Sequence, residues 1–478
     1  MIKDNLRLER HSIDYIPPNQ RHGKASDLIF LWFGANAQMA VVATGLMAVV
    51  PGFSLMWAVL GIVIGTLIGT IFMAYHSAQG PHLGIPQMIQ SRAQFGYYGA
   101  VIPLIMVVLM YLGFYAAGAV IGAQALAMLL HVSVGTGILM SSTVVFLLVL
   151  AGYNMIHKFN RWMSYFFTAV FAVVTVLLIS RGGPVEHAQV AAHGAVHPGF
   201  ILGPFLLSIS LAVINTLGYA PYVADYSRYL PQRTTITSTF WYTYIGIVIS
   251  NSWMMILGAV MQSQAPSTDV LKGFAVLGST LGPWFRILVL LAATLGIVSI
   301  NALNIYGGFM SSLTITSTFL RKLQPTLSLR VWFIIPIAII GTYLAFLEKG
   351  SLLSSFNTFL GVLIDFLVPW TAINLTDYYF VRKGKYNIPD IFRPHGRYGK
   401  FNWMALLAYM IGLVAEVPFM NTALHEGSIA KALHGGDISW VIGIFVTGAI
   451  YLFAAKKFFA RASAPTKEDR EKSSSQVS

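Results

Sequence analysis

Residues 203–222 read Gly203-Pro-Phe-Leu-Leu-Ser-Ile-Ser-Leu-Ala-Val-Ile-Asn-Thr-Leu-Gly-Tyr-Ala-Pro-Tyr222, a stretch long enough to cross a membrane. Its second half contains Asn215, Thr216, Gly218 and Pro221, which a simple membrane anchor does not need. Lipid offers no partners to backbone N–H and C=O groups, so an interrupted helix persists at membrane depth only inside protein or beside a polar cavity. Transporters use such interruptions because the freed backbone groups and helix ends bind substrate and ion. The stretch therefore predicts a broken membrane helix of a transporter.

A second interruption is expected near the N-terminus. The stretch Phe30-Leu-Trp-Phe-Gly-Ala-Asn-Ala-Gln-Met39 places Gly34, Asn36 and Gln38 inside another apolar segment. The same argument applies, since two amides and a glycine are not typical of a helix that faces only lipid. We therefore predict two broken helices in one chain.

The composition indicates one polytopic membrane domain. The chain of 478 residues is 56% hydrophobic and 10% charged, whereas soluble domains average about 25% charged residues. A membrane helix needs roughly 20 mostly apolar residues. We predict an all-α protein with a cytoplasmic segment at 1–27, a transporter domain at 28–458 and a disordered cytoplasmic tail at 459–478. Its twelve expected helices are 28–50, 57–75, 101–129, 136–153, 160–180, 200–222, 237–262, 284–316, 331–347, 352–378, 402–421 and 438–458.

Basic residues set the expected orientation. With the N-terminus inside, the predicted cytoplasmic segments hold 25 Lys and Arg residues and the opposite side holds 5. Because Lys and Arg favour cytoplasmic loops, both termini are expected in the cytoplasm of a cell-membrane protein. The net charge of +13 is scattered over these loops, so we do not expect nucleic acid as a partner. The first 27 residues lack the apolar core of a cleavable signal peptide.

The sequence offers no constellation for an enzyme. There is no cysteine, no G-x-x-x-x-G-K-[ST] loop, no H-E-x-x-H and no G-x-S-x-G. Histidines gather at His187, His193 and His197, where solvated loop residues are a better interpretation than a metal site. We therefore expect no catalytic residue, no resident cofactor and no bound metal.

Four separated motifs carry a family resemblance over roughly residues 10–458, and they are Gly80–Gly96, Pro221–Pro231, Pro369–Lys383 and Ala415–Phe419. Together they resemble the nucleobase:cation symporters, and most closely the purine–cytosine permeases, whose substrates include cytosine, purines, uracil, allantoin, hydantoins and thiamine-precursor pyrimidines. The resemblance implies two inverted five-helix repeats, at about 28–180 and 200–378, plus extra helices at 402–458. It also implies that helices one and six are broken and form a central site with helices three, eight and ten.

The resemblance also implies substrate-binding residues. Nucleobases are flat and edged with donors and acceptors, and a Gln or Asn side chain supplies both groups. Gln38 matches the substrate-contacting position of helix one, although an amide that packs helices together is the alternative. Phe114 falls where the family usually has a stacking Trp, and it is equally suited to packing. The other expected residues are Asn215 and Thr216 in helix six, and Asn301 and Asn304, three apart on one face of helix eight.

Coupling to a proton is favoured over coupling to sodium. Sodium-coupled relatives bind the ion with helix-one carbonyls and two adjacent hydroxyl residues in helix eight. The matching groups are the carbonyls of Gly34, Ala37 and Gly296 and the hydroxyl of Ser299, but Ile300 stands at the second hydroxyl position. A hard cation prefers several oxygen ligands, so sodium binding is impaired.

Two acidic residues at membrane depth are candidates to carry the proton. They are Asp365 in helix ten and Glu416 in helix eleven. Ionisable residues at this depth are costly and usually functional. The alternative is a hydrogen-bonded carboxyl that only holds helices together.

The expected function is symport of a small neutral heterocycle with a proton or sodium ion by a monomer. A carrier of amino acids or amines with the same fold is one alternative, but it would be expected to recognise charged groups. A passive channel is another, and its flux would not respond to ion gradients.

Overall fold

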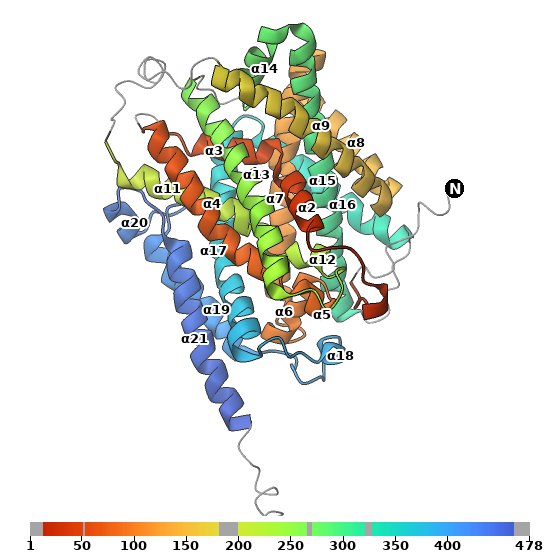
Figure 1. Ribbon diagram of the computed structural model, residues 1–478. Coiled ribbons are helices and arrows are strands. Elements are labelled where there is room, and N and C mark those ends of the chain that lie inside the picture. The colour runs from red at the N-terminus through yellow and green to blue at the C-terminus, as the bar shows by residue number, and fades with distance from the viewer. Residues whose placement is uncertain (1–12, 51–52, 181–198, 265–269, 321–326, 463–478) are drawn as a thin grey trace, which may run out of the picture.

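The computed structural model is a bundle of long helices (Figure 1), described for residues 13–50, 53–180, 199–264, 270–320 and 327–462. The expected histidine group at 187–197 and most of the expected tail lie outside these ranges. The described ranges contain no β-strand, and Asn421 and Glu426 form an isolated bridge. Nine of their helices are long and apolar enough to cross a membrane: α4 (Leu55–Ser77), α7 (Val101–Leu130), α8 (Val134–Ala151), α9 (Tyr153–Ser180), α13 (Ile236–Gln264), α15 (Pro283–Phe319), α16 (Leu327–Glu348), α17 (Leu352–Thr376) and α21 (Ser439–Ala462).

Three further apolar segments complete the expected order. Helices α2 (Asp27–Asn36) and α3 (Met39–Met47) form one bent pair with an angle of 62°. Helices α11 (Leu202–Leu217) and α19 (Trp403–Glu416) are apolar but shorter than a typical span. The all-α membrane fold is thus confirmed. The count of twelve spans is reached only if the bent pair and both short helices each count as one, so that number stays a prediction.

Short helices connect these segments, mostly at one end of the bundle. The stretch 80–96, which hydropathy alone does not predict as helical, folds into two of them. The short elements are η1 (Pro18–Gln20), α5 (Gly80–Leu83), α6 (Gln87–Phe95), α12 (Val223–Ser227), α14 (Lys272–Gly278), η2 (Ser279–Leu281), η3 (Asp377–Val381), α18 (Ile388–Ile391), η4 (Val417–Phe419) and α20 (Ser428–Ala432).

The break in the first segment is capped by a side chain. Helix α2 ends at Asn36, and Gln38 has extended backbone angles of φ −159° and ψ 162°. The Oε1 atom of Gln38 accepts a hydrogen bond of 3.0 Å from the backbone N–H of Ala40. Because the first N–H groups of a helix have no partner within it, this cap satisfies a donor that lipid could not.

In the sixth segment the helix gives way to a turn at the glycine and the proline, and its identity as one discontinuous membrane helix stays a prediction. Helix α11 ends at Leu217, the chain turns through residues 218–222, and α12 starts at Val223. The turn contains its own backbone bonds, including Ala220 N–H to Leu217 C=O at 2.9 Å. Both breaks therefore have polar partners inside the protein, as the membrane interior requires.

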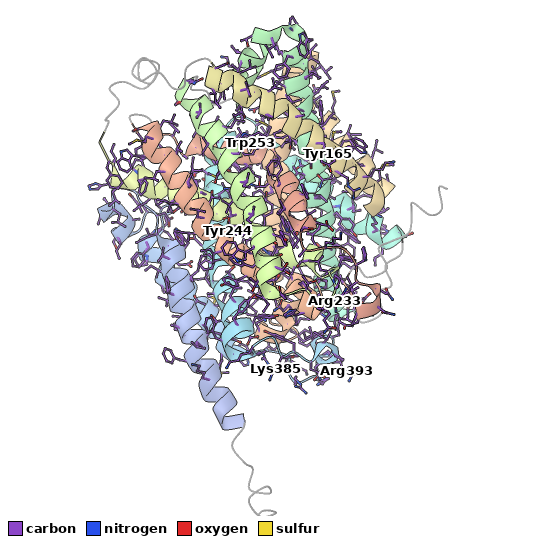
Figure 2. The ribbon with its side chains drawn as sticks, viewed as in Figure 1. Tyr165, Arg233, Tyr244, Trp253, Lys385 and Arg393 are labelled. Atoms are coloured by element: carbon purple, nitrogen blue, oxygen red, sulfur yellow. The ribbon has the colours of Figure 1, made fainter. Side chains whose placement is uncertain are left out.

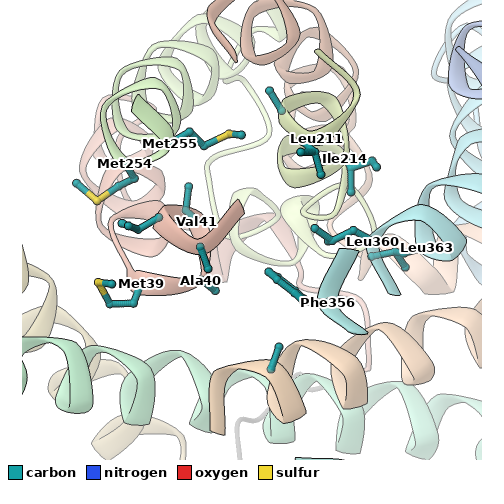
Figure 3. Close-up of a cluster of buried hydrophobic side chains, with 14 of the residues drawn as sticks. Met39, Ala40, Val41, Leu211, Ile214, Met254, Met255, Phe356, Leu360 and Leu363 are labelled. Atoms are coloured by element: carbon teal, nitrogen blue, oxygen red, sulfur yellow. The ribbon is translucent and has the colours of Figure 1, made fainter. Parts of the chain in front are cut away.

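A hydrophobic core packs around the two breaks. In Figure 3 the labelled side chains of this core lie on α3 and α13 and, facing them, on α11 and α17. Burial of these side chains holds the short half-helices in place, because each is too short to be stable alone. The labelled residues are Met39, Ala40, Val41, Leu211, Ile214, Met254, Met255, Phe356, Leu360 and Leu363.

Basic side chains mark one end of the bundle. Figure 2 shows Arg233, Lys385 and Arg393 near the end that carries α18. These residues belong to loops that the charge count assigns to the cytoplasm. The grouping agrees with the expected orientation, which stays a prediction.

Close packing of α4 against α11 generates a stability prediction. A methyl group added at Gly65 would collide with the backbone carbonyl oxygen of Ile209 on α11. We expect Gly65→Ala to destabilise the protein by about 1–3 kcal/mol, the usual cost of overpacking. The measurement is the thermal unfolding midpoint of the detergent-purified protein. Gly199→Ala is the matched control, because nothing lies within 4 Å of its added methyl group; equal midpoints for both variants would contradict the packing argument.

Candidate substrate-binding site

A cavity lies at the junction of the two broken helices, and we call it the site cavity. Four of the six expected substrate-binding residues line it: Gln38, Phe114, Asn215 and Asn304. They come from the break between α2 and α3, from α7, from the end of α11 and from α15. The remaining lining residues are Ala40, Gly118, Gly218, Tyr219, Tyr222 and Ile300.

One buried amide on α13 joins both breaks. The Oδ1 atom of Asn251 accepts hydrogen bonds from Asn36 Nδ2, at 3.2 Å, and from Asn215 Nδ2. The Nδ2 atom of Asn251 donates to Thr66 Oγ1 on α4 at 2.8 Å. The Asn36 Oδ1 atom also accepts a hydrogen bond of 2.8 Å from the Tyr219 hydroxyl, in the turn after α11. Asn36 therefore links the two broken helices directly. Sequence reasoning missed Asn251, which sits in an uninterrupted helix.

The two asparagines of α15 have different surroundings. Asn301 Nδ2 donates to the backbone carbonyl of Tyr115 at 3.0 Å, and Asn301 Oδ1 accepts from Asn304 Nδ2 at 3.2 Å. Asn304 lines the site cavity and Asn301 does not. The geometry makes Asn301 a support that fixes the orientation of Asn304.

Thr216 does not line the site cavity, although its neighbour Asn215 does. The Thr216 side chain is fully buried, and its hydroxyl bonds to the carbonyls of Ala212 and Val213 within α11. A methyl group added at Gly69 would meet Thr216, so this side chain faces α4.

Aromatic rings form the apolar wall of the site cavity. Phe114 lies edge-on to Phe359, with ring centroids 5.2 Å apart. Tyr219 and Tyr222 come from the turn after α11 and stand 5.7 Å apart. The sequence places both tyrosines beside the predicted break, which is the signal that could have identified them.

A second cavity, which we call the inner cavity, adjoins the site cavity. The two share Tyr219, Tyr222, Ile300 and Asn304. The inner cavity continues to Arg228 and to residues near the end of α15, including Thr314. It therefore extends from the two breaks toward the basic end of the bundle.

The groups expected to bind a cation contact helix α9 instead. The carbonyl oxygen of Gly34 accepts a hydrogen bond of 3.3 Å from Ser164 Oγ. Ser299 Oγ donates to Asn160 Oδ1 at 2.7 Å. Gly296 faces the ring of Phe167, and Ile300 lines both cavities with an apolar side chain. Ala37 lies directly at the break, where its N–H bonds to Phe33 C=O.

The two acidic candidates lie away from both cavities. Asp365 is on α17, and Glu416 is the last residue of α19. Both are buried where α17, α19 and α21 pack together, and neither lines the site cavity or the inner cavity. They therefore cannot touch a ligand in the site cavity directly.

Sequence comparisons identify the family. The family model described as a permease for cytosine/purines, uracil, thiamine and allantoin matches residues 15–443. YxlA of Bacillus subtilis (strain 168), provisionally named a purine-cytosine permease, is 43% identical over 452 residues, covering 94% of this chain and 96% of YxlA. The purine-cytosine permease fcyB of Emericella nidulans is 24% identical over 481 residues, covering 95% of this chain and 90% of its own.

Solved structures show the same fold. The inward-facing conformation of Mhp1 superposes with a TM-score of 0.75 at 20% identity, covering 95% of each chain. A closed conformation of Mhp1, a nucleobase-cation-symport-1 family transporter with bromovinylhydantoin bound, gives 0.72 at 18% identity and covers 97% of this chain and 99% of Mhp1. The expected family resemblance is confirmed. This chain belongs to the family of permeases for cytosine and purines, uracil, thiamine and allantoin, and it is an integral membrane transporter, not an enzyme.

Proposed function

We propose that the protein is a secondary active symporter that imports a nucleobase or a related neutral heterocycle by alternating access. The site cavity carries this proposal, because its lining combines uncharged amides with aromatic rings at the two breaks. None of its lining residues is Asp, Glu, Lys, Arg or His. A carrier of amino acids or amines needs groups that pair with charge, so the lining favours a neutral, flat ligand.

The hydrogen bonds around the site cavity define the pattern offered to the ligand. Backbone donation to Gln38 Oε1 makes the Gln38 Nε2 atom the donor, and the Tyr219 hydroxyl also lies within its reach. Asn215 and Asn304 each use their Nδ2 atom on a protein partner, which leaves both Oδ1 atoms as acceptors. A ligand with two N–H donors and one acceptor on its edge complements this set, and nucleobases carry such edges.

We infer that a proton is the coupling ion. The carbonyl of Gly34 already accepts a hydrogen bond from Ser164 on α9, and Ile300 offers no oxygen at the second hydroxyl position. Sodium prefers several free oxygen ligands, so these contacts support a proton instead.

We further propose that the protein is a monomer of the cell membrane with both termini in the cytoplasm. The inner cavity supports release on that side, because it runs from the two breaks toward the basic end. Lys and Arg favour cytoplasmic loops, and the same end carries Arg233, Lys385 and Arg393.

Removing either of two site amides is expected to abolish uptake. Gln38→Ala and Asn215→Ala each delete a group that faces the ligand, which should cut initial uptake of labelled cytosine or hypoxanthine by about tenfold or more. Thr216→Val is the matched control, since the Thr216 hydroxyl bonds only within α11, and it should retain most uptake. Membrane abundance of all three variants must match the wild type. Normal uptake by both amide variants would reject the proposed site.

Methylating the N–H groups of a ligand is expected to weaken binding. A ligand without N–H donors leaves Asn215 Oδ1 and Asn304 Oδ1 unpaired, and each unpaired buried acceptor costs about 1–3 kcal/mol. In a competition assay, 1,3-dimethyluracil should therefore inhibit uptake at least about tenfold less well than uracil, and 1,3,7-trimethylxanthine less well than xanthine. Equal inhibition within both pairs would contradict the recognition pattern.

Replacing sodium should leave uptake intact. In cells or proteoliposomes, accumulation of the labelled base should persist in choline or potassium buffer and collapse when a protonophore removes the proton gradient. The proton provides the driving force in this proposal, whereas a passive channel would equilibrate the base and be insensitive to the protonophore. Strict dependence on sodium would overturn the assignment of the coupling ion.

A further inference from the structure

Three carboxyl groups gather where α17, α19 and α21 pack together. Asp365 is 6% exposed, Glu416 is 0% exposed, and Asp437, just before α21, is 7% exposed. Among the described residues, ion pairs join Arg382 to Asp377 and Arg397 to Asp390, and no cation pairs with any of the three. A buried group of acids without a counter-charge is costly if all of its members are ionised.

Asp437 has the hydrogen bonds of a fixed anion. Its carboxylate accepts from the backbone N–H groups of Asn421 at 2.7 Å and Ser439 at 2.8 Å, and from Ser439 Oγ at 2.7 Å. It also stands at the N-terminal end of α21, where the helix dipole favours negative charge. The arrangement therefore suits an ionised Asp437.

The Ser439 hydroxyl then indicates a proton on Asp365. Ser439 Oγ lies 2.7 Å from Asp437 Oδ1 and 3.3 Å from Asp365 Oδ1. A hydroxyl has one hydrogen to donate, and the shorter contact uses it. The contact with Asp365 becomes a hydrogen bond only if Asp365 is protonated and donates to Ser439 Oγ.

Glu416 has the surroundings of a neutral acid. Both of its carboxyl oxygens are buried without a hydrogen-bond partner among the described residues. One of them lies against Gly443 of α21, in space that a methyl group at Gly443 would fill. A carboxylate that lacks both water and donors is far less stable than the neutral acid, so this conformation holds a proton on Glu416.

The acid cluster is connected to the helix that carries Asn215. Ser210 Oγ on α11 donates to the backbone carbonyl of Asp437 at 2.7 Å, and Trp440 Nε1 donates to Ser210 Oγ at 3.2 Å. Ser210 precedes Asn215 by five residues on α11. The half-helix that lines the site cavity is therefore hydrogen-bonded to the backbone of the segment that carries Asp437.

We propose that Asp365 and Glu416 form the binding site for the protons that drive uptake, with Asp437 as their fixed anionic neighbour. The inference rests on the proposed function, in which the coupling ion is a proton. Each of the two carboxylates accepts one proton from the outer aqueous phase and later releases it to the cytoplasm. Two other titratable groups contact residues next to these acids: the Tyr409 hydroxyl donates to Phe366 C=O, and a ring nitrogen of His425 lies 3.2 Å from Val417 O.

The test uses the full chain in proteoliposomes and the variants Glu416→Gln and Asp365→Asn, which imitate the protonated acids. Three signals are measured with labelled cytosine and hypoxanthine: counterflow exchange, accumulation driven by an imposed pH gradient, and substrate-dependent acidification reported by a trapped pH dye. Both variants should keep counterflow within about twofold but lose accumulation and acidification by about tenfold. Glu426→Gln, an exposed carboxyl on the loop after α19, is the matched control and should behave like the wild type.

The outcomes separate the site from the coupling ion. Acidification and accumulation that survive in both variants, while the wild type also couples to protons, overturn the site alone. A wild type that moves the base without protons overturns the proposed coupling and the site with it. Loss of counterflow together with the other two signals assigns both carboxyls a structural role, and also overturns the site.

Discussion

The architecture depends on how buried side chains satisfy two interrupted helices at membrane depth. Asn251 of α13 is fully buried, and its single Oδ1 atom accepts from one asparagine at each break. Because lipid cannot replace these bonds, parting the breaks from α13 would leave several polar groups unpaired. The same amide reaches Thr66 on α4. Four membrane segments are thus tied together through one side chain, which favours their movement as one body.

Hydrogen bonds between the lining residues and the surrounding protein decide which donors and acceptors the site cavity presents. An amide can present either its oxygen or its nitrogen, and the partner on the far side decides which. For Gln38 that partner is the N–H of Ala40, and for Asn304 it is Asn301, which is itself fixed by the carbonyl of Tyr115. Backbone groups cannot reverse their polarity, so the pattern that faces the ligand is set by the fold and not by side-chain choice alone.

Much of this arrangement could be predicted from the sequence, and the remainder depends on tertiary packing. Hydropathy predicts the segment 101–129 close to α7, and the glycine, asparagine and proline of 203–222 predict the end of α11. Asn215 and Thr216 were expected to act as a pair, yet successive helical residues point about 100° apart, so only one of them faces the cavity. The sequence alone does not show which face of α11 points toward the cavity. Asn251 and Asp437 were missed because partners such as Thr66, for the Asn251 amide, and Ser210, for the Asp437 carbonyl, lie far away along the chain.

Under the proposed proton symport, separation of the uncharged cavity from the acid cluster meets a requirement set by a neutral ligand. A neutral heterocycle carries no charge on which a membrane potential or pH gradient can act, so the driving ion needs a binding site of its own. Placing acids beside the ligand would impose a desolvation cost on the site cavity. Helix α11 resolves this conflict, because Ser210 contacts the acid cluster while Asn215 lines the cavity. At about 1.5 Å of rise per residue the two positions are roughly 7.5 Å apart along one rigid helix. In this proposal a displacement of α11 would change both environments at once, without any contact between ligand and proton.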